Sequence, residues 1–183
     1  VRGEWRRFNA EKSPIKVIAD PELNNPGLDK STLEVAAVNI EENGNRQPIP
    51  YVVPPGIERQ IDYGNYNTNV KLNEQALSLT VNRLSDGYGQ GAYRTSTNDF
   101  RAYKRLQMFI HAEGEQLKGG DLHGFLRLGI DGLDNYYEYD IPLDITAPGS
   151  RDPEAIWPAS NRMNIEIKLF QHAKEARNKG RLP

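Results

Sequence analysis

Apolar and polar side chains alternate along much of the chain, and a period of two is the pattern of a strand with one buried face. The clearest alternation places four apolar residues on one face: Met163, Ile165, Ile167 and Leu169. A shift of one residue would expose all of them, so the pattern predicts that they face a core. Further segments with the same alternation are expected to be strands: residues 77–81, 105–112, 125–130 and 136–145.

Turn-forming pairs separate these segments, and three earlier stretches also have the pattern of extended chain. The pairs are Asn43-Gly44, Asp86-Gly87, Gly119-Gly120, Asp131-Gly132 and Pro148-Gly149, and the extended stretches are residues 3–8, 15–19 and 33–40. Only residues 170–179 have the composition of a helix, with Gly180 placed to end it. The sequence therefore predicts an all-β fold, an antiparallel β-sandwich of the jelly-roll type with long Pro/Gly loops and a short C-terminal helix.

A membrane β-barrel also has alternating strands, so the length of the segments has to decide between the two folds. Membrane strands need about 9–11 residues each and aromatic girdles at both ends. Most segments here are shorter, and their connections are long and polar. The pattern therefore favours the sandwich.

The sequence predicts three parts, of which the last is the main domain. Residues 1–30 are expected to hold strands that belong to, or close against, a preceding module. Residues 31–68 are expected to form a strand followed by a long proline-rich connection. Residues 69–183 are expected to form the main β-sandwich domain.

The proline-rich connection contains the candidate functional segment. Pro54 and Pro55 withhold two backbone donors, so together with Gly56 they cannot join a ladder and predict a stiff, exposed bend. Ile57 offers apolar area beside this bend and Arg59 offers an orienting charge. We expect a docking arm that reaches a neighbouring domain, with a passive connector as the alternative. A Gly/Ser linker in place of residues 51–68 is then expected to leave the fold intact.

Composition removes several classes of function. The chain of 183 residues has 23 Lys plus Arg against 25 Asp plus Glu, a net charge of −2. Electrostatic attraction to phosphate is therefore weak, and no nucleic-acid partner is expected. The absence of cysteine removes disulfides, thiolate catalysis and Cys-based zinc sites. No stretch approaches the 18 apolar residues of a membrane helix.

Three clusters were weighed for chemistry, and for each a structural explanation is favoured. Glu138 and Asp140 share a strand face about 7 Å apart, a spacing that glycosidases permit but that any charged outer face also produces. Residues 131–135 offer oxygen ligands for calcium but fit a hairpin turn better. The three histidines, His111, His123 and His172, lack a metal-ligand spacing. No catalytic, cofactor-binding or metal-ligating residue is assigned.

Nine tyrosines and two tryptophans raise the alternative of a carbohydrate-binding β-sandwich module, because an exposed aromatic ring can stack on a sugar. Tyr137 and Tyr139 lie in phase with Ile141 and Leu143 and are expected in the core. The tyrosines expected in loops or at edges are Tyr63, Tyr66, Tyr88 and Tyr93. A glycan-active enzyme is a third and weaker alternative.

Several longer blocks together resemble the gliding-motility SprA (Sov) family, the giant outer-membrane translocon of the Bacteroidetes type 9 secretion system. The blocks are Gly3-Glu-Trp-Arg-Arg-Phe8, Val38-Asn-Ile-Glu-Glu-Asn-Gly44, Val53-Pro-Pro-Gly-Ile-Glu-Arg59, Asn73-Glu-Gln-Ala-Leu-Ser-Leu79, Tyr103-Lys-Arg-Leu-Gln-Met-Phe-Ile-His-Ala-Glu113, Asn135-Tyr-Tyr-Glu-Tyr-Asp-Ile-Pro-Leu143 and Ile156-Trp-Pro158. They span nearly the whole chain, which is expected to be a fragment of a far longer protein.

The resemblance implies a non-enzymatic structural or interaction module that supports the passage of cargo proteins. The implied partners are the remainder of the translocon barrel, PorV-type shuttle and plug subunits, and the cargo proteins. The implied location is the cell envelope, in association with the outer membrane. Whether the module belongs to an extracellular cap or to the periplasmic side stays open.

Overall fold

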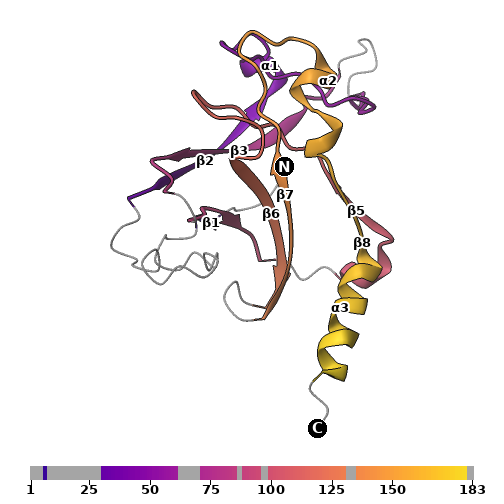
Figure 1. The fold of residues 1–183 in the computed structure, drawn as a ribbon. Helices are drawn as coiled ribbons and strands as arrows, with labels where there is room; N and C mark the ends of the chain where they lie inside the picture. The colour runs from indigo at the N-terminus through magenta and orange to yellow at the C-terminus, as the bar shows by residue number, and fades with distance from the viewer. Residues whose placement is uncertain are drawn as a thin grey trace. The chain divides into compact units, whose positions relative to one another are not determined.

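The computed structural model divides the chain into two compact units, and Figure 1 traces the elements along it. The residues that the structure describes are 6–7, 30–61, 71–85, 88–95, 99–130 and 135–180. The first unit is built from Val1–Arg46, Glu58–Ser96 and Leu128–Tyr136. The second unit is built from Gln47–Ile57, Thr97–Arg127 and Tyr137–Pro183. Neither unit is a continuous stretch of sequence.

The first unit contains a long antiparallel pair, β2 (Thr32–Asn39) and β3 (Gln75–Asn82), in register along their whole length. β3 confirms the strand predicted from the alternation of residues 77–81, and β2 confirms the extended stretch predicted over residues 33–40. β2 ends where Asn39 caps the short helix α1 (Ile40–Asn43), because the Asn39 side chain accepts a hydrogen bond from the backbone N–H of Glu42 at 2.9 Å.

A second pair in the first unit joins β1 (Arg6–Arg7) to β4 (Ala92–Tyr93). Of the extended stretch predicted over residues 3–8, these two arginines are the part that the structure describes. The predicted stretch 15–19 lies outside the described residues, as do the turns at Asp86-Gly87 and Asp131-Gly132.

The second unit contains the antiparallel pair β5 (Arg105–Met108) and β8 (Met163–Glu166). One face of this sheet is core, since Met163 and Ile165 are completely buried. The other face is polar: Arg105 donates to Asn164 at 2.8 Å and to Glu166 at 3.0 Å across the strands. The strand predicted over 105–112 is shorter than expected, because it ends at Met108.

The fourth two-stranded sheet pairs β6 (Leu122–Gly129) with β7 (Tyr136–Leu143). Its turn end, Leu128–Tyr136, belongs to the first unit. Along β7 the residues in phase with Tyr137 are less exposed than Glu138 and Asp140, as predicted. The prediction that Ile130 shares the buried face of β6 is wrong, because its side chain is 96% exposed. Ile130 lies beyond the strand, where its N–H donates to the Asn135 carbonyl at 3.0 Å.

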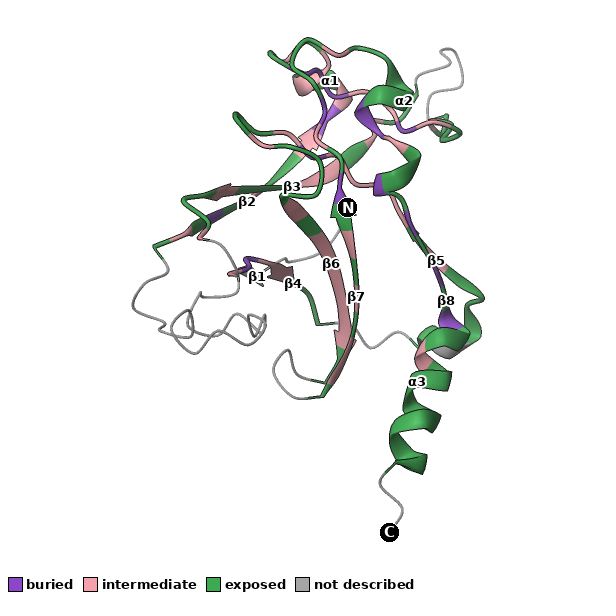
Figure 2. Cartoon of the chain, viewed as in Figure 1, coloured by how far each residue is buried: buried purple, intermediate pink, exposed green. Residues whose placement is uncertain are grey.

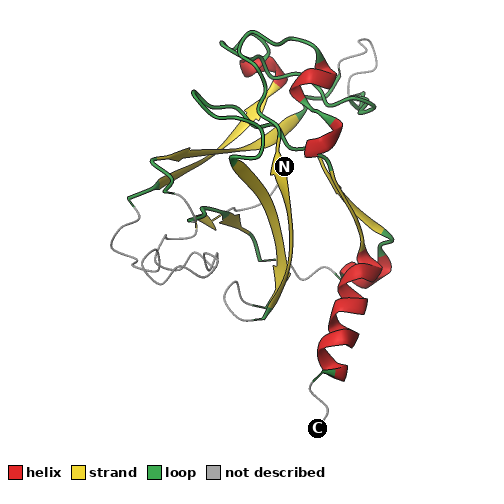
Figure 3. Cartoon of the chain, viewed as in Figure 1, coloured by secondary structure: helices red, strands yellow, loops and turns green. Residues whose placement is uncertain are grey.

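Helical elements are short except at the C-terminal end, as Figure 3 shows. The short ones are α2 (Pro153–Ile156) and two 3₁₀ turns, η2 (Phe100–Ala102) and η3 (Ala159–Asn161). Asp152 caps α2 by accepting a hydrogen bond from the Ala155 N–H at 3.3 Å. Within the described ranges, no helix is long and apolar enough to cross a membrane.

The fold is therefore mostly strands in antiparallel sheets with a short C-terminal helix, as the sequence predicts. The jelly-roll sandwich is not confirmed, because every sheet within the described residues has two strands. Alternation identifies a strand and its buried face but does not say which strands pair or how many. The predicted boundaries at residues 30 and 68 stay a prediction.

The helix α3 (Ile167–Lys179) confirms the predicted C-terminal helix but starts three residues earlier than expected. The prediction that Leu169 faces the core is therefore wrong. Ile167 still lies on the core side of the sheet and is 6% exposed, whereas Leu169 is already helical and 52% exposed. Figure 2 shows that α3 is exposed along most of its length.

Alternation predicts that Ile167 and Leu169 both face the core, but in the structure only Ile167 is buried. Ile167→Asp places a carboxylate in a buried site and should lower the free energy of unfolding by about 3 kcal/mol or more. Leu169→Asp places it on an exposed first turn, where a negative charge is tolerated, and should change stability by less than about 1 kcal/mol. Urea midpoints measure both, and equal midpoints would contradict a helix that starts at Ile167.

Candidate functional site

Trp157 holds the proline-rich segment Gln47–Ile57 inside the second unit. Its indole Nε1 donates a hydrogen bond to the Val52 carbonyl at 2.9 Å, across 105 residues of sequence. The start of the segment is held as well, since the Gly149 N–H donates to the Pro48 carbonyl at 3.1 Å. An irregular segment without a ladder needs such partners for its carbonyls when it is buried.

Aromatic rings surround the indole of Trp157. Tyr51, Phe109 and His111 contact it edge to face, with ring centroids 6.1, 6.4 and 5.9 Å away. This arrangement adds to the free energy of burying the rings. Tyr51 therefore belongs to the core rather than to a passive loop.

The predicted bend is confirmed as a turn, but the expectation that all of it is exposed is wrong. The Ile57 N–H donates to the Pro54 carbonyl at 3.1 Å, and Gly56 has φ +77°. Proline followed by a residue with positive φ is the geometry of a type II turn. Pro54 is buried, Pro55 is half-buried and Gly56 and Ile57 are exposed. Because Tyr51 and Pro54 are buried, a Gly/Ser linker over residues 51–68 would remove part of the core.

Arg59, the last predicted residue of the arm, belongs to the first unit and binds its own chain there. Its guanidinium donates to the Leu72 carbonyl at 2.9 Å and to the Lys71 carbonyl at 3.0 Å. The Leu72 N–H in turn donates to the Gln60 carbonyl at 2.7 Å. Arg59 thus fixes the segment that follows the turn, a role that the sequence alone does not predict.

A second set of hydrogen bonds positions the backbone just before Trp157. His111 Nδ1 lies 2.9 Å from the Ile156 carbonyl and 3.1 Å from Thr146 Oγ1. The carbonyl can only accept, so this nitrogen carries the proton. The Thr146 N–H also donates to the Ala112 carbonyl at 2.8 Å. These bonds join Ile156 of α2 and Thr146 to residues 111 and 112.

Asn161 is the most deeply buried polar side chain in the described core. Its Oδ1 accepts from the Asp144 N–H at 2.7 Å, and its Nδ2 donates to the Asp144 carbonyl at 2.8 Å. Ser160 adds a bond from its hydroxyl to the Asp144 carboxylate at 2.5 Å. The amide therefore completes the backbone bonding of Asp144 as a neighbouring strand would.

The acidic pair weighed for catalysis is engaged in ion pairs on the β6–β7 sheet. Glu138 binds Arg127, whose side chain is 10% exposed, and Asp140 lies 2.9 Å from His123 Nδ1. Arg127 also stacks on the Phe125 ring, with its guanidinium carbon 5.5 Å from the ring centroid. Each carboxylate thus has a structural partner.

The residues weighed for metal and sugar binding do not form a site among the described residues. Within the described part of the chain, no group of three His, Asp or Glu side chains is arranged to hold a metal ion. Asp131 and Asp134, weighed for calcium, lie outside the described residues, as do Tyr63 and Tyr66. Tyr88 is half-buried and Tyr93 is 37% exposed.

Sequence reasoning missed the roles of Trp157 and Asn161. Trp157 was noticed within the block Ile156-Trp-Pro158, and a tryptophan between apolar neighbours was a signal for a core position. Asn161 gave no signal, because asparagine is mostly exposed and common in turns.

A comparison with protein families identifies the family of the chain. The SprA_N family model, described as motility related/secretion protein, matches residues 1–182 and confirms the resemblance inferred from the sequence blocks. A search of curated proteins found no match.

Replacing Trp157 tests its hold on the proline-rich segment. Trp157→Phe removes the bond to Val52 and leaves a gap, so the free energy of unfolding should fall by about 2 kcal/mol. Amide hydrogen exchange in residues 47–57 should accelerate more than in the first unit. Tyr103→Phe, at a 61% exposed ring, is the matched control and should change stability by less than about 0.5 kcal/mol. Unchanged exchange in Trp157→Phe would contradict this anchor.

The two ion pairs of the β6–β7 sheet should differ in strength because their burial differs. Glu138→Gln removes a charged partner of the largely buried Arg127 and should cost about 1–2 kcal/mol. Asp140→Asn affects a pair in which both side chains are 55% exposed and should cost less than about 0.5 kcal/mol. Thermal unfolding of both variants measures the difference, and the reverse order would disprove it.

Proposed function

Because the chain belongs to the SprA_N family of motility related/secretion proteins, we propose that it is a non-enzymatic structural and interaction module of an outer-membrane protein-secretion translocon. Membership of this family supports a location in the cell envelope. In this role the module supports the passage of cargo proteins by docking to the rest of the translocon. PorV-type shuttle and plug subunits and the cargo proteins are further partners in this proposal.

The observation that carries the proposal is the turn at Pro54–Ile57, presented by a segment that the Trp157–Val52 bond fixes. Docking of a flexible loop costs conformational entropy, and a turn that is ordered before docking avoids most of that cost. The two prolines and the Trp157 anchor order this turn within the second unit alone. The segment therefore acts as a docking arm rather than a passive connector.

The exposed end of the turn supplies the contact. Ile57 is 44% exposed and follows Gly56, where the open side of the turn faces solvent. A single apolar side chain on a rigid turn is a common form of anchor in protein interfaces. Pro54 and Pro55 shape the arm, Gly56 permits its positive φ, and Ile57 makes the apolar contact. Arg59 has a different task and holds the chain that follows the turn.

The non-enzymatic part of the proposal rests on how the chain uses its carboxylates. Glu138 and Asp140 bind Arg127 and His123 on an outer face. The Asp144 carboxylate accepts a hydrogen bond from the Ser160 hydroxyl. Each of these carboxylates therefore binds a neighbouring side chain, whereas a glycosidase places two carboxyl groups on either side of the scissile bond in a cleft.

Substitution of Ile57 tests the docking arm. Ile57→Asp replaces the apolar contact by a charge and should weaken docking by about tenfold or more, so secretion or gliding should fall when the variant is expressed in the protein's own cells. The fold should survive, because this side chain lies at the surface. Leu79→Asp is the matched control, since Leu79 is also 44% exposed but lies on β3 of the first unit.

The two variants together decide the outcome. Both should be made in normal amounts and unfold at nearly the same temperature as the unaltered protein. Loss of secretion in Ile57→Asp alone supports the arm. Normal secretion in Ile57→Asp, or equal loss in both variants, would reduce the segment to a connector.

A further inference from the structure

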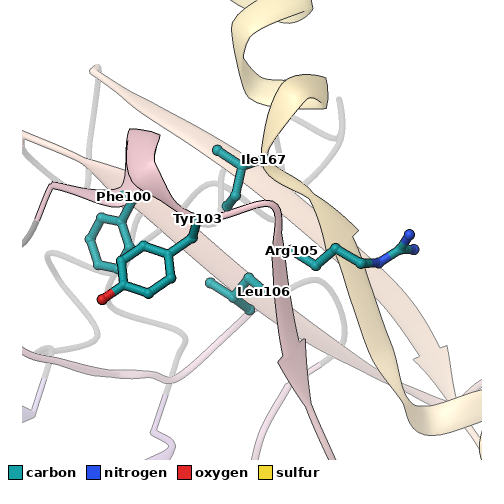
Figure 4. A pocket seen from close by; sticks show the side chains of 5 residues that line it. All are labelled: Phe100, Tyr103, Arg105, Leu106 and Ile167. Carbon is teal, nitrogen blue, oxygen red and sulfur yellow. The ribbon is translucent and has the colours of Figure 1, made fainter.

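A small apolar pocket lies in the second unit where the chain enters β5 and leaves β8, as Figure 4 shows. Its volume is about 140 Å³. The residues that line it are Phe100, Tyr103, Arg105, Leu106 and Ile167. Ile167 and Leu106 lie on the apolar side of the β5–β8 sheet, and the aromatic rings come from the 3₁₀ turn η2 and the residue after it.

The two aromatic rings are held in place although they are exposed. The Tyr103 N–H donates to the Phe100 carbonyl at 3.1 Å, so the turn fixes both residues relative to each other. Tyr103 is 61% exposed and Phe100 is 38% exposed. Exposed apolar groups that gather around a hollow are a mark of a binding surface.

The size of the pocket selects the kind of ligand. Small-molecule sites usually have about 300–1,000 Å³, whereas a cavity of about 150 Å³ holds one benzene ring. A volume of about 140 Å³ therefore suits one aromatic or large aliphatic side chain. A polypeptide that presents one such side chain fits better than a cofactor or a sugar.

The edge of β5 supplies bonding groups for the main chain of such a polypeptide. The Ile167 N–H donates to the Lys104 carbonyl at 3.1 Å, so residues 104 and 167 form a hydrogen-bonded pair of the antiparallel ladder. Such pairs alternate, and the N–H and C=O groups of Arg105 and Gln107 therefore point to the outer edge of β5. Within the described residues the sheet has no third strand at this edge.

The charged side chains around the pocket indicate which charge the ligand should carry. The Arg105 guanidinium points away from the pocket in Figure 4 and is bound by Glu166 and Asn164. Lys104 and Lys168 are exposed and adjoin lining residues, and no ion pair joins them to another described residue. An acidic residue of the ligand is therefore favoured beside the two lysines.

We propose that this pocket and the outer edge of β5 bind an extended segment of a partner protein. The segment adds to the sheet as a strand, places one aromatic or large aliphatic side chain in the pocket, and carries an acidic residue next to it. Main-chain bonds to Arg105 and Gln107 provide the alignment, and the pocket and lysines provide the selectivity. This surface is independent of the arm at Ile57.

Synthetic peptides test the proposal with the 183-residue chain. The probe is a fluorescent acetyl-Ser-Thr-Glu-Phe-Glu-Thr-Ser-amide, and its binding is followed by fluorescence anisotropy. Alanine in place of its phenylalanine should weaken binding about tenfold, because the ring no longer fills the pocket. Tyr103→Ala should have a similar effect, while Leu169→Ala, an exposed apolar residue outside the pocket, should leave binding unchanged.

Two further measurements separate the parts of the mechanism. The double variant Lys104→Glu with Lys168→Glu should reverse the charge preference, so that a peptide with lysines in place of its glutamates binds better. Methyl groups on successive peptide amides should abolish binding at alternate positions, because only every second amide of an added strand faces β5.

Circular dichroism and thermal unfolding confirm that each variant is folded before binding is compared. Absence of binding by the unaltered chain would overturn the proposal, and so would binding that Tyr103→Ala leaves intact. Methylation effects without alternation would overturn the added strand. None of these outcomes depends on secretion in Ile57→Asp. The peptide-binding proposal and the docking-arm proposal are therefore tested independently.

Discussion

One hydrogen bond, from the indole of Trp157 to the Val52 carbonyl, makes a proline-rich segment part of a folded core. Proline withholds the N–H groups that a ladder needs, so the carbonyls of such a segment have few backbone partners. The indole provides a donor, and the same ring supplies apolar area to Tyr51 and Phe109. His111, Thr146 and α2 in turn position Trp157. The rigid turn that ends at Ile57 depends on this bond at its base.

Several polar and charged side chains of this member of the SprA_N family, described as motility related/secretion protein, hold the structure together. Asn161 completes the backbone bonding of Asp144, Arg59 fixes the Lys71–Leu72 backbone, and Glu138 neutralises Arg127.

Sequence reasoning was most successful where structure depends on neighbours along the chain. Alternation identified β3 and the buried face of β7, and the order Pro-Pro-Gly identified a turn. It failed at Leu169 and Ile130, because alternation does not register where a strand ends. Trp157, Asn161 and Arg59 were missed because their roles depend on partners at least 12 residues away. A local pattern holds no information on such distant partners. The burial of Pro54 was not predicted for the same reason.

The separation between Val52 and Trp157 also affects how the protein is made. A ribosome adds about 5–20 residues per second, so Trp157 follows Val52, 105 residues earlier, by about 5–20 seconds. β5 likewise cannot pair until β8 has been synthesised, whereas β6 and β7 are adjacent in sequence and can pair soon after synthesis. During this interval the proline-rich segment has no indole to bind. It can therefore reach its anchored conformation only after Trp157 has been synthesised.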